Sequence, residues 1–208
     1  MGEKMITLHN KDCMEGMRDF PDGFFEWAIV DPPYGAVEMM VSGGGTNRLR
    51  ERMPWDVRPS REYFEELFRV SKNQIVWGGN YFSDFLPISN SWLCWHKGKQ
   101  LNFPEFELAW TSTKKPSGYF YFSRADANIN KVKIKFHPTQ KPRELYVWIM
   151  SRFCKPGDRI LDTHLGGGSI ALAAADMKMA LWGYEISEHY YNKAVERLDL
   201  HRQQLKLF

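Results

Sequence analysis

Strand signals and helix signals alternate along the whole chain, and this alternation limits the fold more than any other feature of the sequence. Short apolar runs indicate buried strands, and apolar residues at helical spacing indicate amphipathic helices. Such alternation is typical of an α/β domain that has a mostly parallel sheet with helices on both faces. We expect strands at residues 6–10, 27–30, 74–77, 92–95, 106–110, 159–162 and 180–185, and helices at 13–20, 61–70, 143–154, 169–177 and 188–200.

Two details refine this expectation. Residues 92–95 and 106–110 are predicted to be antiparallel neighbours at one edge of the sheet, and a short helix is expected after residues 78–80. Residues 35–60 show little apolar periodicity and contain three consecutive glycines, which is typical of a long loop that is functional or mobile.

The length and the composition suit a single domain spanning residues 1–208. Hydrophobic residues make up 43% of the chain and aromatic residues 15%, which is enough for a sizeable core. The three cysteines are widely spaced and form no metal-ligand pattern, which favours a reducing, cytoplasmic setting. No apolar stretch reaches the length of a membrane span, and the first residues lack a signal-peptide profile.

The net charge is only +3, but the basic residues are concentrated in two segments. Residues 111–136 carry six basic side chains and one acidic side chain, and residues 35–60 carry four basic and three acidic side chains. The remainder of the chain is therefore mildly acidic. This distribution suits a polyanion that docks at one face, although charged runs also occur on ordinary solvated surfaces.

The tetrapeptide Asp31-Pro32-Pro33-Tyr34 follows the apolar run at residues 27–30. An acid, two prolines and an aromatic residue at the end of a strand can form a pocket for a flat ring that carries an amino group. The Asp31 carboxylate and a carbonyl of the stiff Pro-Pro unit can each accept one N–H, and Tyr34 offers a stacking face. The alternative is an ordinary strand end followed by a tight turn.

A second group of residues combines a strand, a glycine-rich turn and a helix at residues 160–169. Glycines there let the backbone approach a ligand closely. The next predicted strand ends at Glu185, 23 residues after Asp162, where a carboxylate can accept hydrogen bonds from ribose hydroxyls. The pairing of the turn with Glu185 indicates an adenosine-containing cofactor. A dinucleotide stays an alternative although the G-x-G-x-x-G spacing is absent, and the lack of a phosphate-loop lysine argues against a nucleoside triphosphatase. A structural turn with a solvated Glu185 is the alternative.

Between the two groups lies the segment His137-Pro138-Thr139-Gln140-Lys141-Pro142. Its prolines restrict the backbone, and its polar side chains immediately precede a predicted helix. Such a segment can line a cofactor pocket or serve as a rigid connector.

The order and the combination of these motifs resemble the beta-class amino-methyltransferases of DNA, above all the small bacterial and phage adenine methyltransferases. The resemblance extends over nearly the whole chain, from about residue 6 to residue 198. It implies a circularly permuted, Rossmann-like methyltransferase fold and S-adenosylmethionine as the methyl donor. It also implies a catalytic motif formed by Asp31, Pro32, Pro33 and Tyr34.

The residues that the resemblance assigns to the cofactor site include Asp12 for the adenine and Glu185 for the ribose. The full set is Asp12, Cys13, Asp31, His137, Thr139, Gln140, Lys141, Asp162, Thr163, His164, Gly166, Gly168, Ser169 and Glu185. The chain departs from the family pattern at Thr163-His164, where the family often has Pro-Phe, and at Gly167, where Ser is frequent. The histidines do not have the spacing of a metal site, and the implied chemistry requires no metal.

The implied reaction is direct methyl transfer to the N6 amino group of an adenine flipped out of double-stranded DNA. Residues 35–60 and 111–136 are the expected DNA-contacting loops, and the short second segment favours a homodimer as a hypothesis. The alternatives are N4-methylation of cytosine, RNA as the substrate, or an idle DNA-binding regulator that retains the fold.

Overall fold

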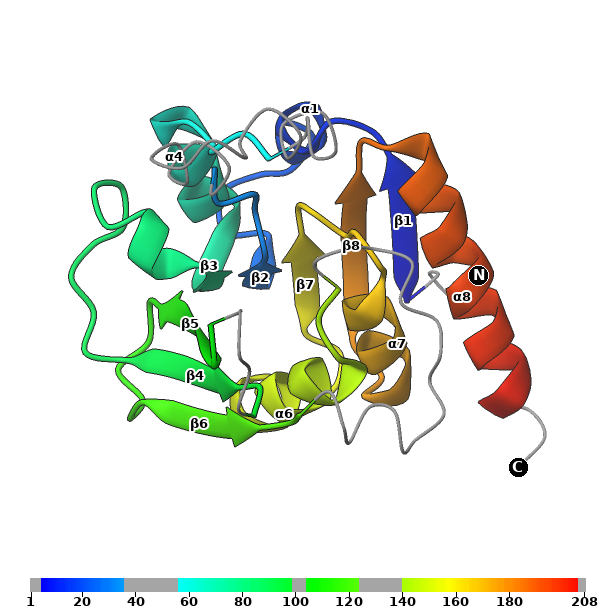
Figure 1. The fold of residues 1–208 in the computed structure, drawn as a ribbon. Helices are drawn as coiled ribbons and strands as arrows, with labels where there is room; N and C mark the ends of the chain where they lie inside the picture. The colour runs from blue at the N-terminus through cyan, green and yellow to red at the C-terminus, as the bar shows by residue number, and fades with distance from the viewer. Residues whose placement is uncertain (1–4, 36–55, 99–103, 124–139, 206–208) are drawn as a thin grey trace, which may run out of the picture.

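A computed structural model of the chain describes residues 5–35, 56–98, 104–123 and 140–205 (Figure 1). One sheet of eight strands runs through the molecule in the order β1-β8-β7-β2-β3-β5-β4-β6. The first five strands in this order are parallel, whereas β5 is antiparallel to both β3 and β4. The strands are β1 (Ile6–Asn10), β2 (Phe25–Val30), β3 (Ser71–Trp77), β4 (Trp92–His96), β5 (Phe106–Thr111), β6 (Gly118–Tyr121), β7 (Arg159–Asp162) and β8 (Ala180–Glu185).

Helices cover both faces of the sheet, as the alternation of the sequence predicts. The helices on one face are α6 (Arg143–Phe153), α7 (Ser169–Asp176) and α8 (Glu188–Leu205), and those on the other are α1 (Cys13–Met17), α4 (Arg61–Val70) and the 3-10 helix η1 (Gly79–Tyr81). Figure 1 shows α8 at one side of the molecule, next to β1 and β8. The predicted α/β fold class is therefore confirmed.

The core consists of two apolar layers that share the strands. Along β2, Trp27 and Ile29 pack with α6 and α7, whereas Ala28 and Val30 pack with α4. Because successive side chains of a strand point to opposite faces, a strand covered on both sides needs an unbroken apolar run. The predicted core tryptophans Trp77, Trp95 and Trp110 are buried, and Trp92 is partly buried.

The sheet order reflects the permuted connectivity that the sequence implies. The first strand, β1, pairs in parallel with the last, β8, from the pair Ile6–Leu181 to the pair Asn10–Glu185. The side-chain amide of Asn10 adds a hydrogen bond of 2.8 Å to the carbonyl of Glu185. The two ends of the described chain therefore build one side of the same sheet.

One prediction about a loop is wrong. Residues 111–136 were expected to form a loop, but residues 118–121 form the edge strand β6, which pairs in parallel with β4. The half-buried Phe120 packs on Trp148 of α6, while Tyr119 and Tyr121 are exposed. The alternation of Phe and Tyr is a strand pattern that the surrounding lysines obscured. Residues 124–136 lie outside the described residues.

Most other boundaries agree with the predictions within a few residues. The helix α1 ends at Met17 rather than at residue 20, and α8 continues to Leu205. The predicted loop at 35–60 is described only at its ends, where the amide of Gly35 donates to the Asp56 carboxylate over 3.1 Å. Among the described helices, none combines the length and the apolar character needed to cross a membrane.

Candidate active site

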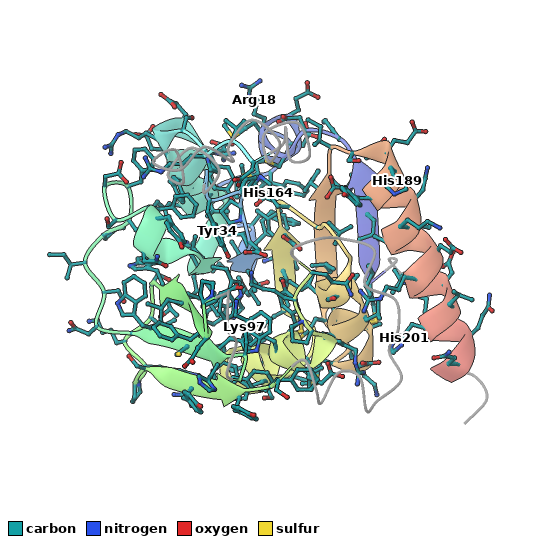
Figure 2. All side chains as sticks on the ribbon, in the orientation of Figure 1. Arg18, Tyr34, Lys97, His164, His189 and His201 are labelled. Atoms are coloured by element: carbon teal, nitrogen blue, oxygen red, sulfur yellow. The ribbon has the colours of Figure 1, made fainter. Side chains whose placement is uncertain are left out.

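The residues singled out in the sequence follow the ends of neighbouring strands. Asp162 and Glu185 end β7 and β8, Asp12 follows β1, and Asp31 follows β2. These four strands are parallel and adjacent, so their carboxyl ends lie along one edge of the sheet. This edge is the usual ligand-binding edge of an open α/β sheet. Figure 2 labels Tyr34 and His164, which follow β2 and β7 and lie near the middle of the molecule.

The glycine-rich turn between β7 and α7 is held against the end of β8. The backbone amides of Gly166 and Ser187 donate to the two oxygens of Glu185 over 2.8 and 2.9 Å. Gly168 has φ +67°, and a Cβ there would lie 2.9 Å from the Cβ of Ala194 in α8. A residue with a side chain would therefore be strained in its backbone and would also collide with α8.

Asp162 and the two residues after it form a buried polar group. Asp162 accepts from the backbone amide of His164 over 3.1 Å, and burial raises the pKa of its carboxyl to about 8. Burial lowers the pKa of His164 to about 4, so its imidazole is neutral at pH 7. The Thr163 hydroxyl lies 2.6 Å from the hydroxyl of Tyr63 and 2.9 Å from Nδ1 of His164. Thr163 and His164 thus make polar contacts where the family pattern has Pro-Phe.

Asp12 has a structural role at the start of α1. Its carboxylate accepts from the amide of Met14 over 2.7 Å and so caps the helix. Burial raises the pKa of the neighbouring Cys13 thiol to about 12, which keeps the thiol protonated. The structure places both residues next to the end of β1, on the same edge as Glu185.

The Asp31-Pro32-Pro33-Tyr34 turn is ordered by its own side chains. The Tyr34 hydroxyl donates to Oδ1 of Asp31 over 2.6 Å, and the Tyr34 ring stacks on Tyr81 with a centroid distance of 5.1 Å. Burial is the main reason why the pKa of Asp31 and the pKa of Tyr34 are both raised. The carboxylate is thus aimed and held before any ligand arrives.

The Lys141 side chain contacts the Asp31-Pro32-Pro33-Tyr34 turn rather than the glycine-rich turn. Its ammonium donates to Oδ2 of Asp31 over 2.6 Å and to the hydroxyl of Tyr34 over 3.1 Å. Its neighbour Gln140 lies at the glycine-rich turn, because a Cβ on Gly167 would fall 2.7 Å from Oε1 of Gln140. That contact explains why glycine suits position 167 in this chain. His137 and Thr139 lie outside the described residues.

Several residues of the site were not predicted from the sequence. Glu107 of β5 lies 3.0 Å from the Lys141 ammonium and 2.8 Å from Nζ of Lys97. The Tyr63 hydroxyl of α4 contacts the Thr163 hydroxyl, and Tyr81 of η1 stacks on Tyr34. Both tyrosines come from the face of the sheet that α1, α4 and η1 cover. A charged residue at an otherwise apolar strand position is the one signal that could have drawn attention to Glu107.

The acidic groups at the ends of β1, β7 and β8 fit S-adenosylmethionine. Carboxylates suit ribose hydroxyls and a cationic amino group, and Gly166 and Gly168 keep side chains away from the turn. Asp31 lies on the next strand, β2, beside these acids. The permuted sheet, the glycine-rich turn and the adjoining Asp-Pro-Pro-Tyr turn together define the class of amino-methyltransferases.

Comparison with known proteins identifies the family within this class. A family model for N6/N4 methyltransferases, described as DNA methylase, matches residues 82–196, and the chain belongs to this family. The type II methyltransferase M.HpaI of Haemophilus parainfluenzae is 22% identical over 96% of this chain and 75% of its own length. Membership confirms the family and the methyl donor, S-adenosylmethionine, that the sequence predicts.

Solved structures agree with this fold. The M1.HpyAVI–SAM complex has a TM-score of 0.64 at 19% identity, covering 93% of this chain and all of that one. The cytosine-N4-specific PvuII DNA methyltransferase also has a TM-score of 0.64, at 14% identity, covering 97% of this chain and 93% of that one. The family match makes the protein a DNA methyltransferase, and both solved structures agree with its fold.

Proposed function

We propose that this protein transfers a methyl group from S-adenosylmethionine to the N6 amino group of an adenine flipped out of double-stranded DNA. The observation that carries the proposal is the Asp31 carboxylate, fixed by Tyr34 and Lys141, on the strand next to Asp162. In the family that the sequence resembles, an aspartate at the first position of the catalytic motif accompanies adenine more often than cytosine.

The chain's own residues act by binding and orienting the base. Asp31 and the carbonyl of Pro32 accept the two N–H groups of the amine, which favours a pyramidal nitrogen with an available lone pair. Bound S-adenosylmethionine supplies an electrophilic methyl group. We propose that Asp12, Asp162 and Glu185 bind this cofactor. Close, in-line positioning then supplies much of the rate acceleration, without a covalent enzyme intermediate. Tyr34 is the proposed stacking partner of the flipped base.

The second candidate function is N4-methylation of cytosine. It is favoured by the structural likeness to the cytosine-N4-specific PvuII enzyme. Adenine and cytosine both present an amino group beside a ring nitrogen, so the same acceptors serve either base.

The test is transfer of a labelled methyl group from S-adenosylmethionine to mixed-sequence duplex DNA, followed by identification of the modified nucleosides. N6-methyladenine supports the proposal, and N4-methylcytosine replaces it by the second candidate. If neither appears, the same assay on RNA and a measurement of DNA binding without turnover distinguish an RNA enzyme from an idle regulator.

Glu185→Gln is expected to weaken S-adenosylmethionine binding by about tenfold, the effect of losing one charge-assisted hydrogen bond. Glutamine keeps the size of the side chain but replaces one of the two oxygens that receive Gly166 and Ser187. Isothermal titration with the cofactor measures the change. Glu188→Gln, an exposed position at the start of α8, is the matched control and should bind normally. Equal affinity of both variants would remove Glu185 from the cofactor site.

DNA contacts are proposed for the loops 35–60 and 111–136, of which residues 36–55 and 124–136 are not described by the structure. Replacing Lys131, Lys133 and Lys135 together by alanine should flatten the dependence of DNA affinity on salt concentration, because fewer counterions are released. Fluorescence anisotropy at several salt concentrations measures the slope. An unchanged slope contradicts the assignment. The homodimer stays a prediction that light scattering at working concentration tests.

A further inference from the structure

We infer that Glu107 is a positioning residue of the methyl-transfer site, which shares the Lys141 ammonium with Asp31 and so leaves the Asp31 carboxylate available to the amino group of the base. This inference rests on the proposed function. It concerns a carboxylate on β5, a strand that carries none of the motifs recognised in the sequence.

The geometry is a row of four alternating charges. Nζ of Lys141 lies 2.6 Å from Oδ2 of Asp31 and 3.0 Å from Oε2 of Glu107. The other oxygen of Glu107, Oε1, lies 2.8 Å from Nζ of Lys97, which follows β4. The row therefore runs Asp31, Lys141, Glu107, Lys97, and the Lys141 ammonium lies between the two carboxylates, closer to Asp31 than to Glu107. Figure 2 shows Lys97 near the inner side of β4 and β5.

Burial prevents Lys141 from leaving this row. Its side chain is 3% exposed, whereas those of Asp31 and Glu107 are 18% and 26% exposed. The ammonium also lies 5.2 Å from the centre of the Trp77 ring. A buried ammonium must stay paired, so any weakening of its bond to Asp31 requires a second anion within reach. Glu107 is that anion.

The groups around Asp31 determine whether a substitution raises or lowers its pKa. Burial raises the pKa of Asp31, the Lys141 ammonium opposes this rise, and the Glu107 carboxylate reinforces it. Among the described residues, Asp31 also interacts with the neutral hydroxyls of Tyr34, Tyr63 and Tyr146 and with the carboxyl of Asp162 on β7.

Glu107 itself remains charged, so it can take up the ammonium. Burial works against its ionised form, but Lys141 and Lys97 together lower the pKa of Glu107 to about 2. The negative charges of the two carboxylates and the positive charges of the two ammonium groups therefore cancel. When the amine of the base donates to Asp31, the ammonium can be held by Glu107 without leaving an unpaired charge in the interior.

Two substitutions should consequently shift the pKa of Asp31 in opposite directions. Glu107→Gln removes the second carboxylate beside Lys141 and leaves Asp31 as its anionic partner, which lowers the pKa of Asp31 and makes it a weaker acceptor for the amine. Lys141→Met removes the counter-ion and raises the pKa of Asp31. Loss of a residue with a merely structural role would not shift the acid limb of the pH–activity profile, which is the fall in rate as Asp31 becomes protonated.

The experiment measures single-turnover methyl transfer against pH for the wild type and both variants. For Glu107→Gln we expect an about tenfold lower plateau rate and an acid limb at lower pH, with unchanged cofactor affinity. For Lys141→Met we expect an acid limb at higher pH. Glu196→Gln removes a carboxylate from an exposed ion pair on α8 and is the control. An unmoved acid limb in Glu107→Gln, or shifts of both variants in the same direction, would overturn the inference.

A second measurement does not depend on activity or on the stability of Lys141→Met. Carbon-13 NMR of aspartate carboxyls, with the Asp31 signal assigned by Asp31→Asn, gives the pKa of Asp31 in the wild type and in Glu107→Gln. A lower pKa in Glu107→Gln supports the shared ammonium, and an equal or higher one contradicts it. If the wild type methylates no nucleic acid, the proposed function fails while this titration still decides whether Lys141 is shared.

Discussion

Asp31→Ala is expected to lower the single-turnover rate of methyl transfer by about 10² to 10³-fold, the loss typical of removing one preorganised hydrogen-bonding group from an active site. The substitution removes the proposed acceptor of the amine, whereas the proposed cofactor residues on β7 and β8 are untouched. Cofactor affinity should therefore change little. Rapid-quench transfer of a labelled methyl group measures the rate, and calorimetric titration measures the affinity.

The row of charges indicates that this variant will fold. Without Asp31, the Lys141 ammonium keeps its ion pair with Glu107 at 3.0 Å, so no buried charge is left unpaired. Asp199→Ala on the exposed side of α8 is the control and should transfer at the normal rate. Normal turnover by Asp31→Ala would refute the proposed mechanism, because the Pro32 carbonyl is assigned to only one of the two N–H groups of the amine.

Gly78→Ala is expected to reduce methyl transfer by about a hundredfold through Tyr34. Gly78 follows β3 with φ +68°, and a Cβ on it would lie 2.2 Å from Cε1 of Tyr34. The tyrosine ring must move, and its hydrogen bond to Asp31 moves with it. A displacement of about 1 Å in a catalytic group costs on the order of a hundredfold in rate. Single-turnover kinetics and thermal unfolding of the same samples measure the two effects.

Gly157→Ala separates backbone strain from the collision with Tyr34. Gly157 has φ +90°, but a Cβ on it would meet nothing within 4 Å. Both variants should lose thermal stability, because a non-glycine residue in the left-handed region costs about 1–2 kcal/mol. Only Gly78→Ala should also lose methyl-transfer activity. If both variants keep the normal rate, Tyr34 does not need its observed position.

The fold was predictable because its elements are determined by local patterns. The helix at 61–70 and the strands at 6–10, 159–162 and 180–185 agree with the structure residue for residue. The strand β6 was missed because lysines and serines flank it, which lowers the local apolar character. Its pairing with β4 depends on tertiary contacts with α6 that no local window contains.

The site was predictable to the extent that its motifs are continuous in sequence. Asp31 and Tyr34 are separated by two residues, so their hydrogen bond is a property of one short turn. The pairing of Asp31 with Lys141 spans 110 residues and depends on how the segment before α6 folds back. Glu107 belongs to no motif, so its approach to Lys141 followed only from the position of β5 in the sheet.

The pairing of β1 with β8 affects the order in which parts of the protein fold during synthesis. Residues 6–10 leave the ribosome early, but their parallel partner at residues 181–185 is made 175 positions later. Pairing across such a separation carries a high loop-closure cost and is slow. The strands β2 to β6 can assemble while the chain is still growing, and the β1–β8 side must follow. A nascent chain therefore has its Asp31-Pro32-Pro33-Tyr34 turn before the sheet edge that carries Asp12 and Glu185 is paired.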